Sequence, residues 1–451
     1  MRHFLTLVAG ACGLLLACDT DSNGPTYRVA SRPTFELQNP HTHVMLPRGQ
    51  TRSAIASLSS SDGPFPSNGG PSFQYICCNG ISDHYGPIVL DQRVAVIYWS
   101  SRAVYVGGPG PGTTGAGSAD GSLVGFFLNH ISESPYYNIN STYATQFYDP
   151  VYPPPYSFGM NVRNSVTYTQ YWAANSNVPM ADSTVSDAAI RAQIAAGLAG
   201  GQLAYDSNTA YLVFGDSTVN LGGGFPKDYC AYHGHFVWNG KPVRYGVMPR
   251  IRRVAGCDDL NGSPNDDAVA DAELSALVHE IEEINTDPDL NAWYDSEGQE
   301  NGDKCAHNPG TTYQTANGAT ANVNLGGKDF LIQQNWLNTS PGSGCALSYQ
   351  HLTATVLGPM NITTAGTYSW EVSPLFGTGS YTYKWFHYND AGWNEWDGPT
   401  TRVFTATVVE DISQGPPYNY QDNYFRVSVV SGGVTWDADI RVRVCINCDT
   451  P

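Results

Sequence analysis

The sequence predicts an α/β (α+β) domain over residues 86–350, followed by an all-β immunoglobulin-like sandwich over residues 351–451. Two observations support this division. In the first part, nearly continuous apolar runs alternate with amphipathic helical patterns, as in a sheet covered by helices. In the second part, short alternating strands are separated by turn residues, and no helical pattern intervenes.

The elements of the first part begin with residues 93–99, an apolar run that we expect to form a central strand. A helix is expected near residues 122–131. Another should begin at Ser183 or Ser186, because apolar residues then recur at helical spacing. Further buried strands are predicted at residues 209–214 and 243–247.

The second part is expected to contain strands of period two, typical of a sheet with one face buried. We see no catalytic cluster in it, and such modules usually act as spacers or adhesion units. The clearest strands are residues 367–372, 381–385, 424–429 and 440–444.

Residues 1–18 are expected to be a lipoprotein signal peptide. Arg2 and His3 precede an apolar stretch that is too short to cross a bilayer as a helix. The stretch ends in Leu-Leu-Ala-Cys, which resembles the lipobox of bacterial lipoproteins. The resemblance implies that Cys18 is lipidated, with the chain anchored to a membrane in the cell envelope, on the extracytoplasmic side (periplasmic or cell surface).

Residues 19–85 lack sustained periodicity and are rich in Ser, Pro, Gly and Asn, so we expect a flexible tether. The chain carries a formal net charge of −18 although only 14% of its residues are charged. This balance argues against a nucleic-acid partner, which requires a basic face. It is typical of a β-rich exported protein, and membrane attachment should depend on the acyl chains.

The cysteine content indicates disulfides. Of ten cysteines, two belong to the predicted signal peptide, and an even number remains, as expected for an exported chain. We prefer the pairs Cys230 with Cys257 and Cys305 with Cys345, because each would close a loop around the motifs described below. Cys445 and Cys448 are expected to form a terminal staple, and the partners of Cys77 and Cys78 stay open.

The most informative segment is a predicted helix over residues 272–284. Its apolar residues fall on one stripe. Ala272, Ala276, His279 and Glu283 lie on the opposite side, where a solvated helix would carry long charged side chains. We therefore expect this helix to be covered on both sides.

His279-Glu280-x-x-Glu283 is a variant of the zincin pattern H-E-x-x-H. Side chains at positions i and i+4 converge on one metal ion, and the intervening glutamate activates water. The pattern predicts a zinc site in a zincin-like domain, formed by His279 and Glu283. The third ligand would be Asp287, Glu300 or Asp303. The alternative is an ordinary solvated helix, because H-E-x-x-E arises by chance in glutamate-rich helices.

Residues 279–288 and 291–294 resemble the hallmark of the EXORDIUM / phosphate-induced protein 1 family, H-E-I-x-E-x-x-T-[ND]-P-x-x-N-A-W-Y. Residues 300–305 are similar to its E-I-x-D-L-C, although Asn301 stands where an apolar residue is usual. Plant members also lack the C-terminal sandwich. Looser similarity covers residues 94–99, 229–233, 322–324 and 330–336, so that the resemblance extends over about residues 85–350 in the right order.

The resemblance implies an extracellular location and a shared fold. Plant members of the family are apoplastic proteins linked to cell expansion and to phosphate or brassinosteroid responses. Bacterial relatives resemble secreted proteins of unassigned role. The resemblance implies no established reaction.

Two functional hypotheses follow. In the first, the chain is a zinc-dependent metallohydrolase, most simply a peptidase, in which Glu280 polarises water. His233 and His235 alternate along a predicted strand, and His233 is the better candidate for a substrate-polarising group or a minor metal site. In the second, the chain is a non-catalytic surface protein that binds cell-wall glycan or a protein partner. Sugar stacking could use Trp238, Trp293, Trp393 and Trp396, although Trp293 is better explained as a core residue.

Overall fold

The computed structural model describes residues 42–50, 80–147, 158–216, 218–339, 342–389, 392–395, 399–408 and 421–446. The predicted signal peptide with Cys18 lies outside these residues. The same holds for Cys77, Cys78, Trp396 and Cys448.

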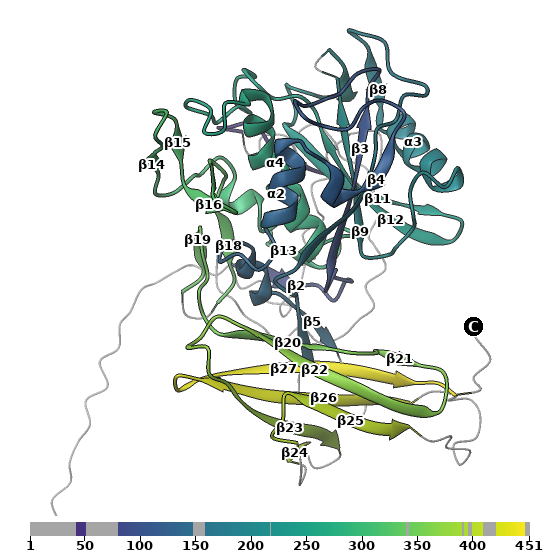
Figure 1. Cartoon of the computed structure of the whole chain (residues 1–451), viewed down its shortest axis with the longest axis vertical. Helices are drawn as coiled ribbons and strands as arrows, with labels where there is room; N and C mark the ends of the chain where they lie inside the picture. Colours follow the sequence, from purple (N-terminus) through teal and green to yellow (C-terminus); the bar gives the residue numbers. More distant parts are fainter. Residues whose placement is uncertain are drawn as a thin grey trace, which may run out of the picture.

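The N-terminal domain is built on a seven-stranded sheet in the order β1-β11-β12-β9-β3-β7-β4 (Figure 1). The four central strands β12, β9, β3 and β7 run parallel, and each of the other three pairs antiparallel with its neighbour. The strands are β1 (Thr42–Met45), β3 (Gln92–Trp99), β4 (Thr114–Ala116), β7 (Val166–Trp172), β9 (Thr209–Gly215), β11 (Ala231–Trp238) and β12 (Lys241–Met248).

Helices cover both faces of this sheet. Because successive strand residues point to opposite faces, Val94 and Val96 of β3 belong to one core, and Ala95 and Ile97 belong to the other. Helices α2 (Leu123–His130) and α4 (Ala268–Thr286) pack in the first core, and α3 (Asp187–Ala199) packs in the second. The predicted α/β layer and its strands at residues 93–99, 209–214 and 243–247 are confirmed.

Side-chain caps explain where the helices begin. The hydroxyl of Ser122 accepts a hydrogen bond from the amide of Gly125 at the start of α2. Ser186 does the same with Ala189, which settles the choice between Ser183 and Ser186 for α3. Asp267 caps α4, and this helix is buried without interruption from Ala270 to Thr286. The expectation that the motif helix is covered on both sides is confirmed.

The predicted tether over residues 19–85 is wrong for residues 42–46. Here β1 pairs antiparallel with β11, with His43 opposite His233, and the segment is buried. The physical reason is that β11 would otherwise expose an unpaired sheet edge, and the apolar side chains of Val44 and Met45 fill the cores beside it. Near the end of the predicted tether, β2 (Ser82–Asp83) pairs with β13 (Trp293–Tyr294).

Short elements connect these layers. Three are 3-10 helices, namely η2 (Gly117–Ala119), η3 (Tyr137–Thr142) and η4 (Asp303–Cys305). The others are short strands, namely β5 (Ala144–Phe147), β6 (Phe158–Asn161), β8 (Thr184–Ser186), β10 (Asn220–Gly222), β14 (Tyr313–Gln314), β15 (Thr320–Ala321), β16 (Val323–Leu325), β17 (Lys328–Phe330), β18 (Asn335–Leu337) and β19 (Gly344–Ala346).

The C-terminal domain is a β-sandwich, as predicted. A three-stranded sheet, β20-β22-β25, packs on a five-stranded sheet, β21-β27-β26-β23-β24, around a core that includes Trp370, Trp385 and Val427. The strands are β20 (Thr353–Leu357), β21 (Asn361–Ile362), β22 (Gly366–Leu375), β23 (Thr382–Asn389), β24 (Gly392–Glu395), β25 (Val403–Val408), β26 (Gln421–Ser431) and β27 (Val434–Val444).

Both preferred disulfides, Cys230–Cys257 and Cys305–Cys345, are present. Cys445 is also disulfide-bonded, whereas its predicted partner Cys448 lies outside the described residues. Within the described part of the chain, no helix has the length and apolar character needed to cross a membrane.

Candidate metal centre

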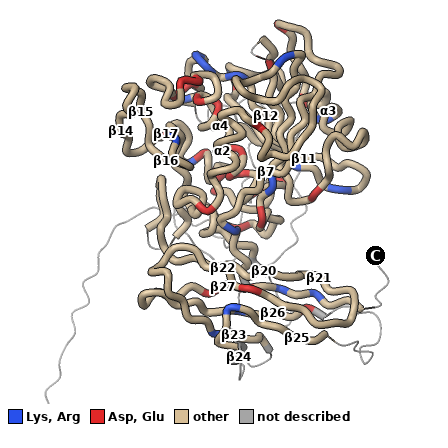
Figure 2. Tube along the Cα trace, in the orientation of Figure 1, with Lys and Arg blue, Asp and Glu red and all other residues tan. Residues whose placement is uncertain are grey.

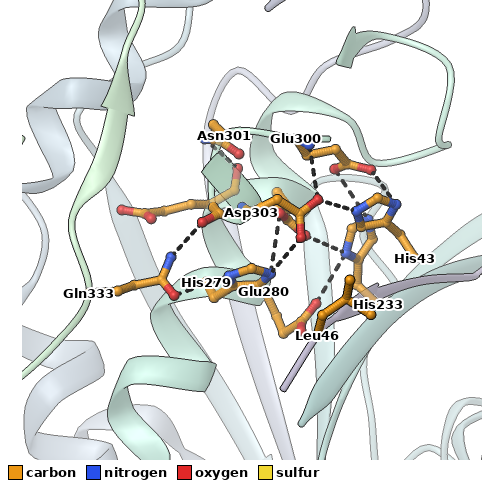
Figure 3. Close-up of polar contacts among 12 residues, drawn as sticks. His43, Leu46, His233, His279, Glu280, Glu300, Asn301, Asp303 and Gln333 are labelled. Atoms are coloured by element: carbon orange, nitrogen blue, oxygen red, sulfur yellow. Dashed lines mark hydrogen bonds and ion pairs between the residues drawn. The ribbon is translucent and has the colours of Figure 1, made fainter. Parts of the chain in front are cut away.

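Ionisable side chains gather where α4 faces β1, β11 and the segment 300–305, which we call the ligand loop (Figure 3). Figure 2 marks the acidic positions along α4 and around it inside the N-terminal domain. None of these side chains is more than 5% exposed. The group, called the buried cluster below, consists of His43, His233, His279, Glu280, Glu283, Glu300 and Asp303.

The motif helix supplies the first ligand pair. His279 Nε2 lies 3.2 Å from Glu283 Oε1, one helical turn later, and 3.8 Å from Asp303 Oδ1 in the ligand loop. Ligand atoms bound about 2.1 Å from a tetrahedral zinc ion stand about 3.4 Å apart. The three atoms therefore have the spacing of a metal ligand set.

Gln333 fixes the orientation of the His279 ring. Its side-chain amide Nε2 donates to the carbonyl of Gly302 at 2.9 Å, so its oxygen faces His279. This oxygen lies 3.2 Å from His279 Nδ1, which must be the donor. In the neutral imidazole, the lone pair is then on Nε2, directed at the two carboxylates.

The sheet supplies two more histidines. His43 and His233 are cross-strand partners whose ring centroids are 5.5 Å apart. His233 Nδ1 lies 3.1 Å from Glu280 Oε2, and its Nε2 lies 3.7 Å from Glu300 Oε2. His43 Nδ1 lies 3.2 Å from Glu300 Oε1. Residues of two strands, one helix and one loop thus meet at a single place.

The ligand loop approaches α4 closely. The amide of Asp303 donates to Glu283 Oε1 at 3.0 Å, and the amide of Glu300 donates to Asp303 Oδ2 at 3.0 Å. A Cβ atom on Gly302 would stand 2.9 Å from His279 Nδ1 and 3.0 Å from Glu283 Oε1. Only glycine fits between these ligands without displacing one of them. The Cys305–Cys345 disulfide anchors the end of the loop.

Several polar atoms of the buried cluster lack a hydrogen bond within the described structure: His233 Nε2, His279 Nε2, Glu280 Oε1 and Glu283 Oε2. Buried polar atoms in native proteins almost always have a partner. Imidazole nitrogens and carboxylate oxygens are zinc ligands. The buried atoms and their spacing therefore fit a bound metal ion.

The electrostatics of the metal-free cluster lead to the same conclusion. Burial lowers the pKa of His279, but the carboxylates of Glu283, Glu280 and Asp303 outweigh it and raise the pKa to about 10. Burial raises the pKa of Glu280 to about 7, although the neighbouring histidines oppose it. Burial would also raise the pKa of Glu283, yet His279 and His233 hold it well below its usual range. In the metal-free cluster, His279 and Glu280 thus hold protons, and a bound metal ion could replace this positive charge.

A second buried layer supports α4 from behind the cluster. The hydroxyl of Tyr136 donates to Glu282 Oε2 at 3.3 Å, and burial raises the pKa of Glu282 well above its usual range. Asn301, unusual for the resembled family, accepts a hydrogen bond from Thr286 at 3.1 Å and donates to Asn140 at 3.3 Å. The polar residue at position 301 therefore ties the ligand loop to the end of α4.

The structure brings most of the predicted site residues together: His279, Glu280, Glu283, Glu300, Asp303 and His233. Asp287 is the exception, and its role as a metal ligand stays a prediction. It belongs to no group of converging ligand atoms among the described residues. Because α4 ends at Thr286, the Asp287 carboxylate instead accepts the amide of Ala292 at 2.7 Å and fixes the turn after the helix.

Sequence reasoning missed His43 and Gln333. The only signal for His43 was its place before the apolar residues Val44 and Met45, inside a segment without periodicity. Among the candidate sugar-stacking residues, Trp293 is 4% exposed and packs against Tyr143. It is therefore a core residue, which is the interpretation that the sequence favoured.

The chain matches no family model and no curated protein. Solved structures with limited similarity to it include the following two domains. The PKD domain (329–428) of human KIAA0319 is 17% identical, with a TM-score of 0.16, over 22% of this chain and 86% of that one. The CARDB domain of the PF1109 protein from Pyrococcus furiosus, solved in complex with di-metal ions, is 19% identical, with a TM-score of 0.14, over 21% of this chain and 87% of that one.

Proposed function

We propose that this chain is an exported protein of the cell envelope, lipid-anchored through Cys18, with a zincin-like zinc centre that hydrolyses peptide-like substrates. One observation carries the proposal: His279, Glu283 and Asp303 place three ligand atoms at metal-binding separations, with Glu280 beside them. This is the arrangement that a zincin helix would produce, with a carboxylate in place of its second histidine.

Each residue has a defined role in this proposal. His279, Glu283 and Asp303 would hold the ion, and zinc bound there would supply Lewis-acid activation of water and of a substrate carbonyl. Glu280 Oε1 is buried and has no hydrogen bond among the described residues, so this carboxylate could accept a proton from water. His233 holds the other oxygen of Glu280 in place at 3.1 Å.

The decisive test combines metal content and turnover. Protein purified without chelators should contain zinc by elemental analysis. His279→Ala should lose the ion bound by this ligand set, whereas His235→Ala on the same strand as His233 should retain it. Glu280→Gln should retain zinc but lose turnover of a mixed fluorogenic peptide library. Absence of any transition metal from the wild-type protein would end the hydrolase proposal.

A second function is favoured by one observation, the near-complete burial of the cluster. In this alternative, the ion is structural, and the chain binds cell-wall glycan or a protein partner without catalysis. Chelation would then lower the melting temperature, while wild type and Glu280→Gln would show equal and negligible peptide turnover. Turnover that depends on Glu280 would exclude this alternative.

Membership in the EXORDIUM / phosphate-induced protein 1 family is part of the proposal. It is supported by the place of the resembling segments in the fold. Residues 279–288 and 300–305 contribute ligands, residues 229–233 end at His233, and residues 330–336 contain Gln333. Segments that are separate in the chain thus surround one centre.

The anchor has its own test. Cys18→Ser should move the protein from the membrane fraction to the soluble fraction and abolish its labelling by a fatty-acid analogue. A Cys18→Ser protein that stays acylated would contradict lipidation at this position.

A further inference from the structure

The buried cluster contains more ligands than one zinc ion uses. Structural zinc takes four ligands, and catalytic zinc takes three from the protein. His279, Glu283 and Asp303 are assigned to one ion, and Glu280 lies beside them. The buried cluster contains three further side chains with possible ligand atoms: His43, His233 and Glu300.

Glu283 lies between the two halves of the cluster. Its Oε1 lies 3.2 Å from His279 Nε2, and its Oε2 lies 3.4 Å from His233 Nδ1 on the opposite side. Ligand atoms of His43, Glu283 and Glu300 also lie within 4.8 Å of one another, as do those of His279, Glu283 and Asp303. Glu283 is therefore common to two complete ligand sets.

The contacts of the two sheet histidines direct one nitrogen of each ring toward Glu300. Glu280 lies 3.1 Å from His233 Nδ1, so that ring can direct its Nε2 lone pair toward Glu300. His43 Nε2 lies 2.6 Å from Asp303 Oδ2, which places its proton there and leaves Nδ1 facing Glu300 at 3.2 Å. A carboxylate bonded to the far nitrogen is the usual support of a metal-binding histidine.

Charge balance favours a second cation. The cluster contains four carboxylates, three with no measurable exposure and Asp303 at 5%. One divalent ion would leave two negative charges that only protons on the remaining histidines or carboxylates could balance, in a region closed to water where unpaired charge is strongly unfavourable. Two divalent ions balance four carboxylates and let the three imidazoles stay neutral, which is their metal-binding form.

We propose that the centre is dinuclear, with a second divalent transition-metal ion held by His43 and Glu300 and bridged to the first ion by Glu283, and with His233 beside Glu300. The inference rests on the proposed function, because the first ion occupies the His279 ligand set. It assigns His43 and Glu300 as ligands and leaves Glu280 as the group that orients His233. Paired ions bridged by a carboxylate are typical of enzymes that activate water between two metals.

The test is the number of ions per chain, measured by elemental analysis after equilibration with zinc and gel filtration. Wild type should retain two ions. His43→Gln and His279→Gln should each retain one, and Glu283→Gln should lose both. His235→Gln, on the same strand as His233, is the matched control and should retain two. Circular dichroism verifies that each variant is folded.

The outcomes separate this inference from the proposed function. One ion per chain, lost in His279→Gln and kept in His43→Gln, overturns the dinuclear centre and leaves the zinc hydrolase proposal intact. No ion in the wild type overturns both. One ion that is lost in His43→Gln and kept in His279→Gln overturns the His279 ligand set and with it both proposals.

A measurement on the wild type avoids the risk that a variant fails to fold. Cobalt(II) added to the metal-free protein should bind to two equivalents, as followed by visible absorption. The paramagnetic resonance signal should grow over the first equivalent and weaken over the second, because a shared carboxylate couples the two ions. A signal that stops changing at one equivalent overturns the inference.

Discussion

His43 and His233 stand opposite each other in neighbouring antiparallel strands, and each lies within 4 Å of a different oxygen of Glu300. The pairing makes β1, a strand of four residues at the sheet edge, part of the candidate centre. The edge strand therefore contributes directly to the centre. The geometry of the centre depends on the ligands and also on the residues that hold the ligands in position.

Gln333→Met should weaken zinc binding about 10–100-fold, the usual effect of removing a residue that orients a metal ligand. Methionine keeps the volume of the side chain but cannot accept the proton of His279 Nδ1, so the ring loses its fixed orientation. Competition with a chromogenic chelator measures the change. Gln202→Met at an exposed position is the control, and equal affinities of the two variants would contradict the role of Gln333.

Gly302→Ala should lower both zinc affinity and stability. The added methyl group would stand about 3 Å from His279 and Glu283, and the overpacking should cost about 1–3 kcal/mol. Gly110→Ala, where a Cβ meets nothing within 4 Å, should change neither property. Calorimetry and zinc titration of the two variants provide the comparison, and normal zinc binding in Gly302→Ala would show that the loop position is not critical.

Glu282→Gln should stabilise the protein increasingly as pH rises from 5 to 8. Burial raises the pKa of Glu282 well above 4.5, so the folded chain retains a proton that the unfolded chain releases. Stability from this group is full below pH 4.5 and falls by about 1.4 kcal/mol per pH unit above it, until the pH reaches the raised pKa of the folded state. Glutamine removes this loss. Urea unfolding at pH 5, 6.5 and 8 measures the free energy of unfolding of Glu282→Gln relative to wild type, with exposed Glu297→Gln as the control. A difference between Glu282→Gln and wild type that does not change with pH would contradict the prediction.

Loss of the Cys305–Cys345 disulfide, by replacement of both cysteines with serine, should cost about 2–5 kcal/mol and also weaken zinc binding. The bond anchors the end of the ligand loop, two residues after Asp303. The Cys230–Cys257 pair should cost similar stability with a smaller effect on zinc, because His233 is held by strand pairing on both sides. Equal zinc affinities of the two double variants would contradict this role of the loop disulfide.

The sequence predicted well those features that depend on residues close together in the chain. The apolar stripe and the alanines of α4 predicted a helix covered on both sides, and His279 and Glu283 were paired by helical spacing alone. The apolar strand at residues 93–99 and the alternating strands of the sandwich were predicted for the same reason, because periodicity reports which faces are buried. Asp287 was assigned by proximity in sequence, and the end of α4 directs it elsewhere.

What could not be predicted depends on contacts between distant segments. β1 is too short for a periodic signal, and only its pairing with β11 identifies His43 as part of the cluster. Gln333 follows β17, and its contact with His279 depends on the path of the ligand loop, because its amide donates to the carbonyl of Gly302. The choice among Asp287, Glu300 and Asp303 likewise required the path of that loop.

The near-complete burial of the cluster should limit the rates at which a metal ion binds and dissociates. An ion enclosed on all sides leaves only when the ligand loop lifts or the chain unfolds, so its residence time reflects protein opening and is independent of chelator concentration. The proposed export would place the folding of the chain outside the cytoplasm. The metal present there while the chain closes, more than the relative affinities of the finished site, then decides which element the mature protein carries.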